Sequence, residues 1–278
     1  VLNKSTDAIE DLYALFRNKK LYRFVKAAEV AGARSHSKDL LIVVDTHRPN
    51  FTEAPELLPL FERVVVIDHH RRGAEIIENT SLLYQEPYAS SASEMISEIL
   101  QYITSDVVLE PLEASALLSG IVLDTKNFVF NTGVRTFDAA SFLRRQGADT
   151  RLVRELFKED LLEAVIKSNI VSSSVLIEEG IALSESSEAS ENIKTIISQG
   201  ADELIDIKGI HTSFVLGTDP QGKIYISARS TGEMNVQVIL EKLGGGGHLE
   251  TAGAQLENTT IEEAKILLLE KIKESLEV

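Results

Sequence analysis

Two short runs of aliphatic residues stand out in the first part of the chain, and each ends abruptly in polar side chains. Residues 40–44 read Leu-Leu-Ile-Val-Val and stop at Asp45, whereas residues 64–67 read Val-Val-Val-Ile and stop at the Asp-His-His triplet of residues 68–70. Such runs are too short for a confident helix, so they predict strands that are buried on both faces. A short helical segment or turn lies between them, and this order predicts a parallel sheet in an α/β fold.

The rest of the chain alternates between helical and extended patterns. Apolar spacing predicts helical segments within residues 5–30, 56–61, 95–103, 113–120, 132–145 and 151–169, with a further strand at 81–84. Beyond a serine cluster, strands are predicted at 181–183, 213–216, 223–227 and 252–256, and helices at 191–198, 235–243 and 261–276. We therefore predict two α/β domains: residues 1–170, with a parallel sheet and a linker helix, and the smaller domain 171–278.

Composition narrows the classes of protein that the chain can belong to. At 278 residues, with 44% hydrophobic and 26% charged residues, it has the profile of a globular protein of about two domains. The absence of cysteine excludes disulfides and thiolate-bound zinc. A net charge of −15 disfavours binding to duplex nucleic acid, but a small phosphorylated ligand remains compatible once cations occupy the carboxylates.

The candidate chemistry lies where the apolar runs end. Asp45 follows the first run, Asp68 with His69 and His70 follows the second, and Asp124 ends a third apolar segment. In open α/β sheets, ligands bind outside the carboxyl ends of the strands. Carboxylate oxygens and imidazole nitrogens together suit hard or borderline divalent cations. For any one of these residues alone, capping of the next turn is the simpler explanation.

A run of glycines in the second domain has two interpretations. Four consecutive glycines, Gly244, Gly245, Gly246 and Gly247, precede His248. They either stop a helix and form a flexible linker, or they let the backbone pass close to a phosphate and present free N–H groups to it. Arg229 and Ser230 end a predicted strand nearby in sequence, and an arginine there suits bidentate phosphate binding.

Taken together, the motifs resemble a known family. Val44-Asp45-Thr46, Ile67-Asp68-His69-His70, Leu123-Asp124-Thr125 and the stretch from Gly244 to His248, in this order, resemble the DHH–DHHA1 phosphoesterase superfamily over nearly the whole chain. In finer detail, residues 43–49, 67–72 and 120–128 resemble the catalytic module of membrane-anchored cyclic-di-AMP phosphodiesterases of the GdpP type. The combination of motifs is much more specific than any one of them.

The resemblance implies a site for two Mn²⁺ ions and a hydrolytic reaction. Asp45 would bridge the ions, His69 and Asp124 would bind one of them, and His70 would belong to the catalytic centre. Hydroxide would attack phosphorus in line and open cyclic-di-AMP to linear 5′-pApA. The second domain would hold the nucleotide through Arg229, Ser230, Asn235 and the loop from Gly244 to His248.

The chain departs from the family pattern at its amino-terminal end. The first family motif, a His followed by Asp-x-Asp at the end of the first strand, is not found, and residues 4–9 offer one acid and no His. We therefore expect this chain alone to form a defective metal site, and the complete enzyme to supply the missing ligands.

Partners and location follow from the same resemblance. It implies a bacterial nucleotide-signalling enzyme, with this chain as the cytoplasmic, soluble domain of a membrane-anchored protein. The expected ligand is a cyclic dinucleotide or pApA, with no duplex nucleic acid and no membrane contact from this segment itself, and a homodimer is left open. Two other functions also stay open: a nanoRNase-like exonuclease of short oligoribonucleotides, and a non-catalytic nucleotide-binding module.

Overall fold

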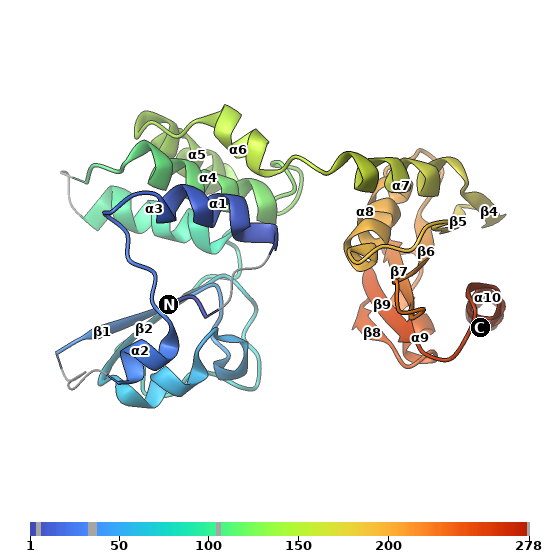
Figure 1. Cartoon of the computed structure of the whole chain (residues 1–278), viewed down its shortest axis with the longest axis horizontal. Helices are drawn as coiled ribbons and strands as arrows, with labels where there is room; N and C mark the ends of the chain where they lie inside the picture. Colours follow the sequence, from blue (N-terminus) through green and yellow to red (C-terminus); the bar gives the residue numbers. More distant parts are fainter. Residues whose placement is uncertain (4–6, 33–37, 104–106, 277–278) are drawn as a thin grey trace. The chain divides into compact units, whose positions relative to one another are not determined.

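The computed structural model describes residues 1–3, 7–32, 38–103 and 107–276 of the chain. Its contacts divide the chain into two compact units, Val1–Lys158 and Glu159–Val278 (Figure 1). Among the described residues, no helix combines the length and the apolar character that crossing a bilayer requires.

The first unit contains the predicted parallel sheet. Its strands are β1 (Leu40–Val44), β2 (Arg63–Asp68) and β3 (Leu82–Gln85), hydrogen-bonded in the order β1-β2-β3. The central strand is covered on both faces: Val64 and Val66 pack with Leu58 and Ile77, whereas Ile67 packs with Met95 on the other side. The parallel α/β prediction is confirmed, and the carboxyl ends of all three strands meet at one edge.

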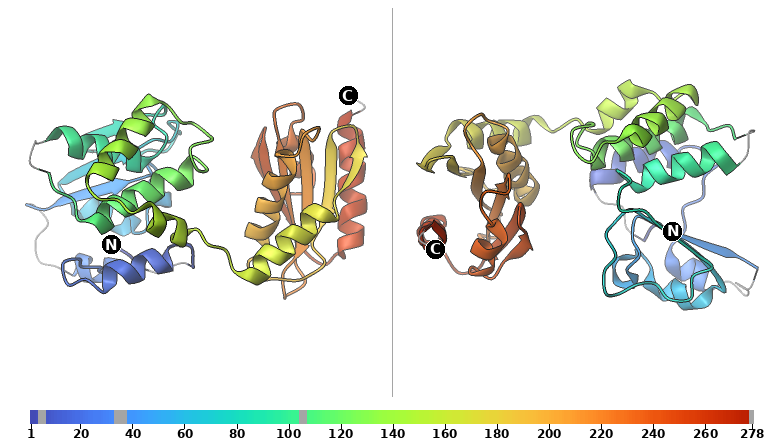
Figure 2. Two further views of the ribbon diagram at one scale, coloured as in Figure 1. Left: turned by 90° about the horizontal axis from the view of Figure 1, so that it is seen from above. Right: turned by 180° about the vertical axis from the view of Figure 1, so that it is seen from behind.

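Helices surround this sheet (Figure 2). They are α1 (Asp7–Arg17), α2 (Ala27–Ala31), the 3-10 helices η1 (Pro49–Phe51) and η2 (Pro55–Leu60), α3 (Ala92–Ile103), α4 (Pro111–Asp124), α5 (Val134–Arg145) and α6 (Thr150–Leu156). The helices α4, α5 and α6 share a core built from Leu118, Ile121, Leu143 and Val153. Gly120 permits a close approach of α4 to α3, because a Cβ there would lie 2.1 Å from the Ser93 hydroxyl oxygen.

The second unit is a mixed sheet with helices on both faces. Its elements are α7 (Leu161–Ser172), β4 (Val175–Glu178), β5 (Ile181–Glu185), α8 (Ile193–Ile205), β6 (Thr212–Thr218), β7 (Ile224–Ser230), α9 (Val236–Glu241), β8 (Gly246–His248), β9 (Thr251–Leu256) and α10 (Ile261–Leu276). The strand order is β4-β5-β6-β7-β9-β8, and β5 with β6 is the parallel pair. One core holds α7 and α8, and another holds α9 and α10.

The predicted long helix over residues 151–169 is wrong, because the structure has two helices there. The helix α6 ends at Leu156, and α7 starts afresh at Leu161. The Asp160 carboxylate accepts a hydrogen bond from the Leu162 backbone N–H at 2.8 Å, so this acid caps a new helix instead of lying within an old one.

The helix that we predicted over residues 191–198 runs past Gly200 and ends at Ile205. A Cβ at Gly200 would lie 2.9 Å from a methyl carbon of Ile170, so this glycine provides space for α7 to pack on α8. The same contact places α7 in the second unit. The predicted boundary near residue 170 therefore falls inside α7, whereas the contacts divide the chain just before Glu159.

Candidate metal centre

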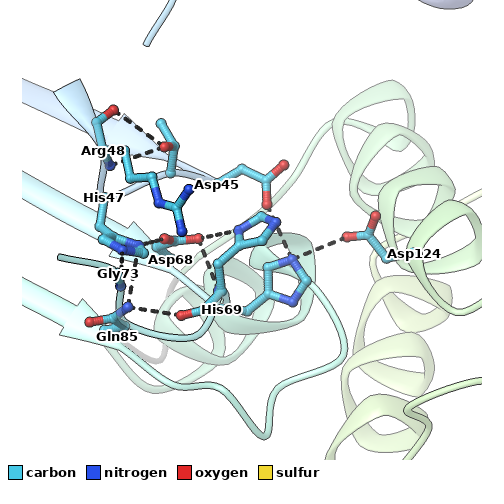
Figure 3. Close-up of polar contacts among 10 residues, drawn as sticks. Asp45, His47, Arg48, Asp68, His69, Gly73, Gln85 and Asp124 are labelled. Carbon is cyan, nitrogen blue, oxygen red and sulfur yellow. Dashed lines mark hydrogen bonds and ion pairs between the residues drawn. The ribbon is translucent and has the colours of Figure 1, made fainter. Parts of the chain in front are cut away.

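Four of the predicted site residues converge at the carboxyl edge of the first sheet (Figure 3). Asp45 directly follows β1, His69 and His70 directly follow β2, and Asp124 is the last residue of α4. The His69 Nε2 atom lies 3.3 Å from Asp45 Oδ1 and 3.8 Å from Asp124 Oδ2. Three separate elements thus bring a carboxylate, an imidazole and a second carboxylate together.

This arrangement fits a divalent cation. Among the described residues, Asp45, His69 and His70 offer ligand atoms that all lie within 4.8 Å of one another. Donor atoms that bind one ion at about 2.1 Å lie about 3 to 4 Å apart, and the 3.3 Å between His69 Nε2 and Asp45 Oδ1 falls in this range. The donors are oxygen and nitrogen only, which excludes a preference for thiolate-seeking ions. Asp124 lies outside that tightest group but contacts it through His69.

The charges of this cluster are unbalanced without a cation. A hydrogen bond to the Asp45 carboxylate raises the pKa of the His69 imidazole, burial opposes the rise, and the negative charge of Asp124 adds to it. Burial raises the pKa of the Asp124 carboxyl, and the nearby charge of Asp45 raises it further. A bound cation would take over the charge that this imidazolium proton supplies, so metal binding should release protons.

The buried carboxylate of Asp68 holds two imidazoles in place. Asp68 and His47 are 0% and 2% exposed, respectively. One Asp68 oxygen accepts hydrogen bonds from the His70 backbone N–H at 3.1 Å and from His70 Nδ1 at 2.7 Å, and the other contacts His47 Nδ1. Burial alone would raise the pKa of Asp68, but the hydrogen bonds from His47 and His70 lower it. With Nδ1 committed to Asp68, the other ring nitrogen of His70 is the one left to bind a cation.

Sequence reasoning missed the supporting roles of His47 and Gln85. The Gly73 backbone N–H donates to His47 Nε2 at 3.0 Å, so His47 Nδ1 carries the proton that faces Asp68. Gln85 Nε2 donates to the His70 carbonyl oxygen at 2.8 Å. Their positions in the sequence could have predicted these roles. His47 lies two residues beyond Asp45, and Gln85 is the last residue of the third strand, which ends at the same edge of the sheet.

The backbone turns sharply where it delivers the two acids. Asp45 has a φ of 65°, in the left-handed region that non-glycine residues rarely adopt. After Asp124, the hydroxyl of buried Thr125 donates to the Ile121 carbonyl oxygen at 2.6 Å and accepts from the Phe128 backbone N–H at 2.9 Å. Such left-handed, non-glycine conformations cost energy and are concentrated at functional sites.

In the second unit, some of the predicted nucleotide-binding residues border a pocket of about 520 Å³. Arg229, Gly244 and Gly245 line it. The Arg229 guanidinium donates from Nε to Asp202 at 2.9 Å and also contacts Ser198. This side chain is therefore held in position at the pocket wall.

Ser230 and Asn235 do not line that pocket. The Ser230 hydroxyl accepts from the Gly232 and Met234 backbone N–H groups at 3.1 and 3.2 Å, and its side chain points to the opposite face of β7 from that of Arg229. Asn235 caps α9 by accepting from the Val238 backbone N–H. Both side chains thus have structural partners within the unit.

The glycine run is divided between a helix end and a strand. Gly244, with a φ of 76°, ends α9 in a left-handed conformation. Gly246 and Gly247 belong to β8, which pairs with β9. The expected loop is therefore in part an edge strand, and this strand ends at the exposed His248. A Cβ at Gly245 or at Gly247 would lie 2.3 Å from a carbonyl oxygen of β9, whereas a Cβ at Gly246 would meet nothing within 4 Å.

Two family models match the chain, one in each unit. The model described as "DHH family, N-terminal domain" matches residues 4–121, and the model described as "DHHA1 domain" matches residues 179–277. The chain belongs to the DHH–DHHA1 phosphoesterase superfamily. Asp45, His69 and His70 therefore lie within the DHH match, and Asp124 lies three residues beyond its end. The pocket that Arg229 lines lies within the DHHA1 match.

Relatives with similar sequences carry informative names. The chain is 50% identical to a protein of Geobacillus thermodenitrificans named cyclic-di-AMP phosphodiesterase GdpP, over 86% of this chain and 36% of that protein. It is 47% identical to a Listeria monocytogenes protein named cyclic-di-AMP phosphodiesterase PdeA, over 88% of this chain and 37% of that protein. The chain thus spans little more than a third of the length of these relatives.

A solved structure has a similar fold. An exopolyphosphatase-related protein from Bacteroides fragilis matches with a TM-score of 0.73 at 18% sequence identity. The match covers 98% of this chain and 82% of that one. At this level of identity the similarity supports the fold and carries no information about substrate.

Proposed function

We propose that this chain is the catalytic module of a metal-dependent phosphodiesterase that hydrolyses cyclic-di-AMP to linear 5′-pApA. The observation that carries the proposal is the convergence of Asp45, His69 and Asp124 from three elements onto one edge of the DHH sheet. The names of the relatives supply the substrate, because both are cyclic-di-AMP phosphodiesterases by name.

In this proposal, Asp45, His69 and Asp124 would be the ligands that this chain supplies to Mn²⁺. Such ions lower the pKa of a water and offset the charge that develops on a phosphodiester. Other residues of the chain fix the orientation of the two imidazoles. Asp68 orients His70 through a hydrogen bond. Hydrogen bonds to Asp45 and to the Ala89 backbone orient His69. The sequence contains no Asp-x-Asp motif, so we propose that this chain holds part of the two-ion site.

The second unit supplies nucleotide binding in the same proposal. Arg229 lies at the wall of the 520 Å³ pocket, where its guanidinium, held by Asp202, Ser198 and Ser227, would supply positive charge toward a phosphate. The edge strand β8 carries the half-buried Gly246 and the exposed His248, whose backbone and imidazole donors would face a ligand. Ser230 and Asn235 would support this region through the turn and the helix cap that they form.

Gly246→Val is expected to weaken cyclic-di-AMP binding about tenfold or more while leaving the fold intact. A side chain at position 246 meets no protein atom within 4 Å, so a loss of affinity would report contact with the ligand. Isothermal titration calorimetry measures the dissociation constant. Gly245→Val is the matched comparison, because its side chain would strike β9 and lower the melting temperature. Native affinity in Gly246→Val would leave the glycine run with a purely structural role.

Product analysis tests the proposed reaction. The full-length protein, incubated with Mn²⁺, should convert cyclic-di-AMP to pApA and should act slowly on pApA and on longer oligoadenylates, as followed by chromatography. Release of AMP from the linear substrates, with cyclic-di-AMP left intact, would favour the oligoribonucleotide exonuclease instead. Nucleotide binding without hydrolysis of any of these compounds would favour the binding module.

A further inference from the structure

A cavity of the first unit lies next to the candidate metal centre. Its volume is about 790 Å³, and its walls come from the residues that follow β2, the residues that follow β3 and the segment that precedes α5. The side chains and backbone that line it include Arg71, Arg72, Tyr88, Ala89, Asn131 and Gly133. None of these residues was among the predicted site residues.

Chain connectivity and one hydrogen bond join this cavity to the metal centre. Arg71 directly follows His70. The Ala89 backbone, which lines the cavity, hydrogen-bonds the His69 imidazole. On the opposite wall, Val129 follows five residues after Asp124. The cavity therefore adjoins the segments that carry His69 and Asp124.

The two arginines of the cavity are not neutralised by acids. Both are exposed, and within the described part of the chain neither guanidinium has an ion pair or a hydrogen bond. Acids outnumber bases by 43 to 28 in this chain, and other arginines, such as Arg135, do have carboxylate partners. A guanidinium left without an acid in such a protein is free to bind the planar, bidentate face of a phosphate.

Tyr88 gives the same cavity an aromatic surface. Its side chain is 93% exposed, so the face of the ring is open to a ligand. Exposed aromatic rings beside cationic groups are the surfaces on which nucleic-acid bases stack, independently of base identity. A guanidinium pair beside an open ring thus has the chemistry of a nucleotide site.

A network of ion pairs holds the two walls of the cavity together. Arg135, two residues beyond Gly133, donates to the Glu98 carboxylate at 2.7 and 2.6 Å. Its Nη1 atom also lies 3.8 Å from Glu86, which is two residues before Tyr88. The walls are therefore fixed before any ligand arrives, which lowers the entropic cost of binding.

We propose that this cavity binds the non-reacting half of a dinucleotide. Arg71 and Arg72 bind its second phosphate and Tyr88 stacks on the adjoining base, while the reacting phosphate lies at the metal centre. This inference rests on the proposed phosphodiesterase function and adds the element that selects substrates with two phosphates over mononucleotides.

Calorimetric titration of the 278-residue chain with 5′-pApA and with AMP, both in Mn²⁺ buffer, tests the inference. The double variant Arg71→Ala/Arg72→Ala should lose about tenfold or more in affinity for pApA and should change little toward AMP, because AMP carries one phosphate. Tyr88→Ala should also weaken pApA binding about fivefold or more, and Tyr88→Phe should retain it. Arg151→Ala, which removes an exposed arginine of the same unit outside the cavity, is the matched control.

The outcomes separate this inference from the proposed function. Arginine variants that bind pApA as tightly as the wild type overturn the inference and leave the phosphodiesterase proposal standing. An equal loss of pApA and AMP binding also overturns it, because the second phosphate would then not be singled out. A wild-type chain that binds neither ligand contradicts the inference as well, and the hydrolysis assay with full-length protein then decides the proposed function by itself.

Discussion

Asp45→Asn is expected to reduce the Mn²⁺ affinity of this chain by at least about 100-fold, more than the loss of a residue that only orients a ligand. The change removes the charge of the carboxylate that lies 3.3 Å from His69, and no other acid of the cluster comes as close to that imidazole. Asparagine is the right replacement because residue 45 has a left-handed backbone, which asparagine tolerates better than alanine does. Calorimetric titration with Mn²⁺ measures the change.

A matched variant and a rescue experiment sharpen this test. Glu62→Gln removes an exposed acid just before β2, at the amino edge of the same sheet, and should leave Mn²⁺ affinity unchanged. In the full-length enzyme, Asp45→Asn should lose hydrolysis that excess Mn²⁺ does not restore. Nearly normal turnover in that variant would refute the proposed role of Asp45 as a metal ligand.

Asp68→Ala is expected to lower the free energy of unfolding by about 1 to 3 kcal/mol, because removing this buried acceptor leaves the buried His47 Nδ1–H without a hydrogen-bond partner. The lost carboxylate is fully buried and serves both His47 and His70, so two imidazoles lose their acceptor. Mn²⁺ affinity should fall by about 10- to 100-fold as His70 loses its fixed orientation. Urea unfolding monitored by circular dichroism measures the first effect, and calorimetry measures the second.

His70→Ala distinguishes the two consequences of losing Asp68. The His70 side chain is more than half exposed, so its removal should cost less than about 1 kcal/mol of stability while still weakening the metal site. A fully stable Asp68→Ala protein would mean that His47 finds another acceptor, and the proposed supporting role of Asp68 would then be wrong.

The strands of the first sheet and the edge of the candidate site could be predicted from sequence, and the reason is physical. A run such as Val64 to Ile67 has few alternatives to a buried strand, and the carboxyl ends of parallel strands share one edge. The positions of Asp45 and His69 followed from that rule alone. Asp124 was predicted at the end of an apolar segment, and the structure makes that segment a helix.

Other features depended on contacts between distant residues and could not be predicted. Gly200 looks like a helix stop in sequence, and only the packing of Ile170 against it shows why the helix continues. Gly245 and Gly247 lie where β8 passes so close to β9 that a side chain would clash with a carbonyl oxygen. The sequence shows four glycines in a row, but it does not show which of them this close approach requires. Likewise, sequence shows an acid at position 68, but its burial between two imidazoles is a property of the folded sheet.

The outer side of β1 has a consequence for how this chain behaves in solution. Within the described residues β1 pairs only with β2, and its side chains Leu40, Ile42 and Val44 are 51%, 54% and 50% exposed. An aliphatic edge strand with unpaired backbone groups is a template for another strand, and natural proteins protect such edges with lysine, proline or a covering element. Concentrated preparations of this chain should therefore associate edge to edge, and a charged residue in place of Ile42 should keep them monodisperse.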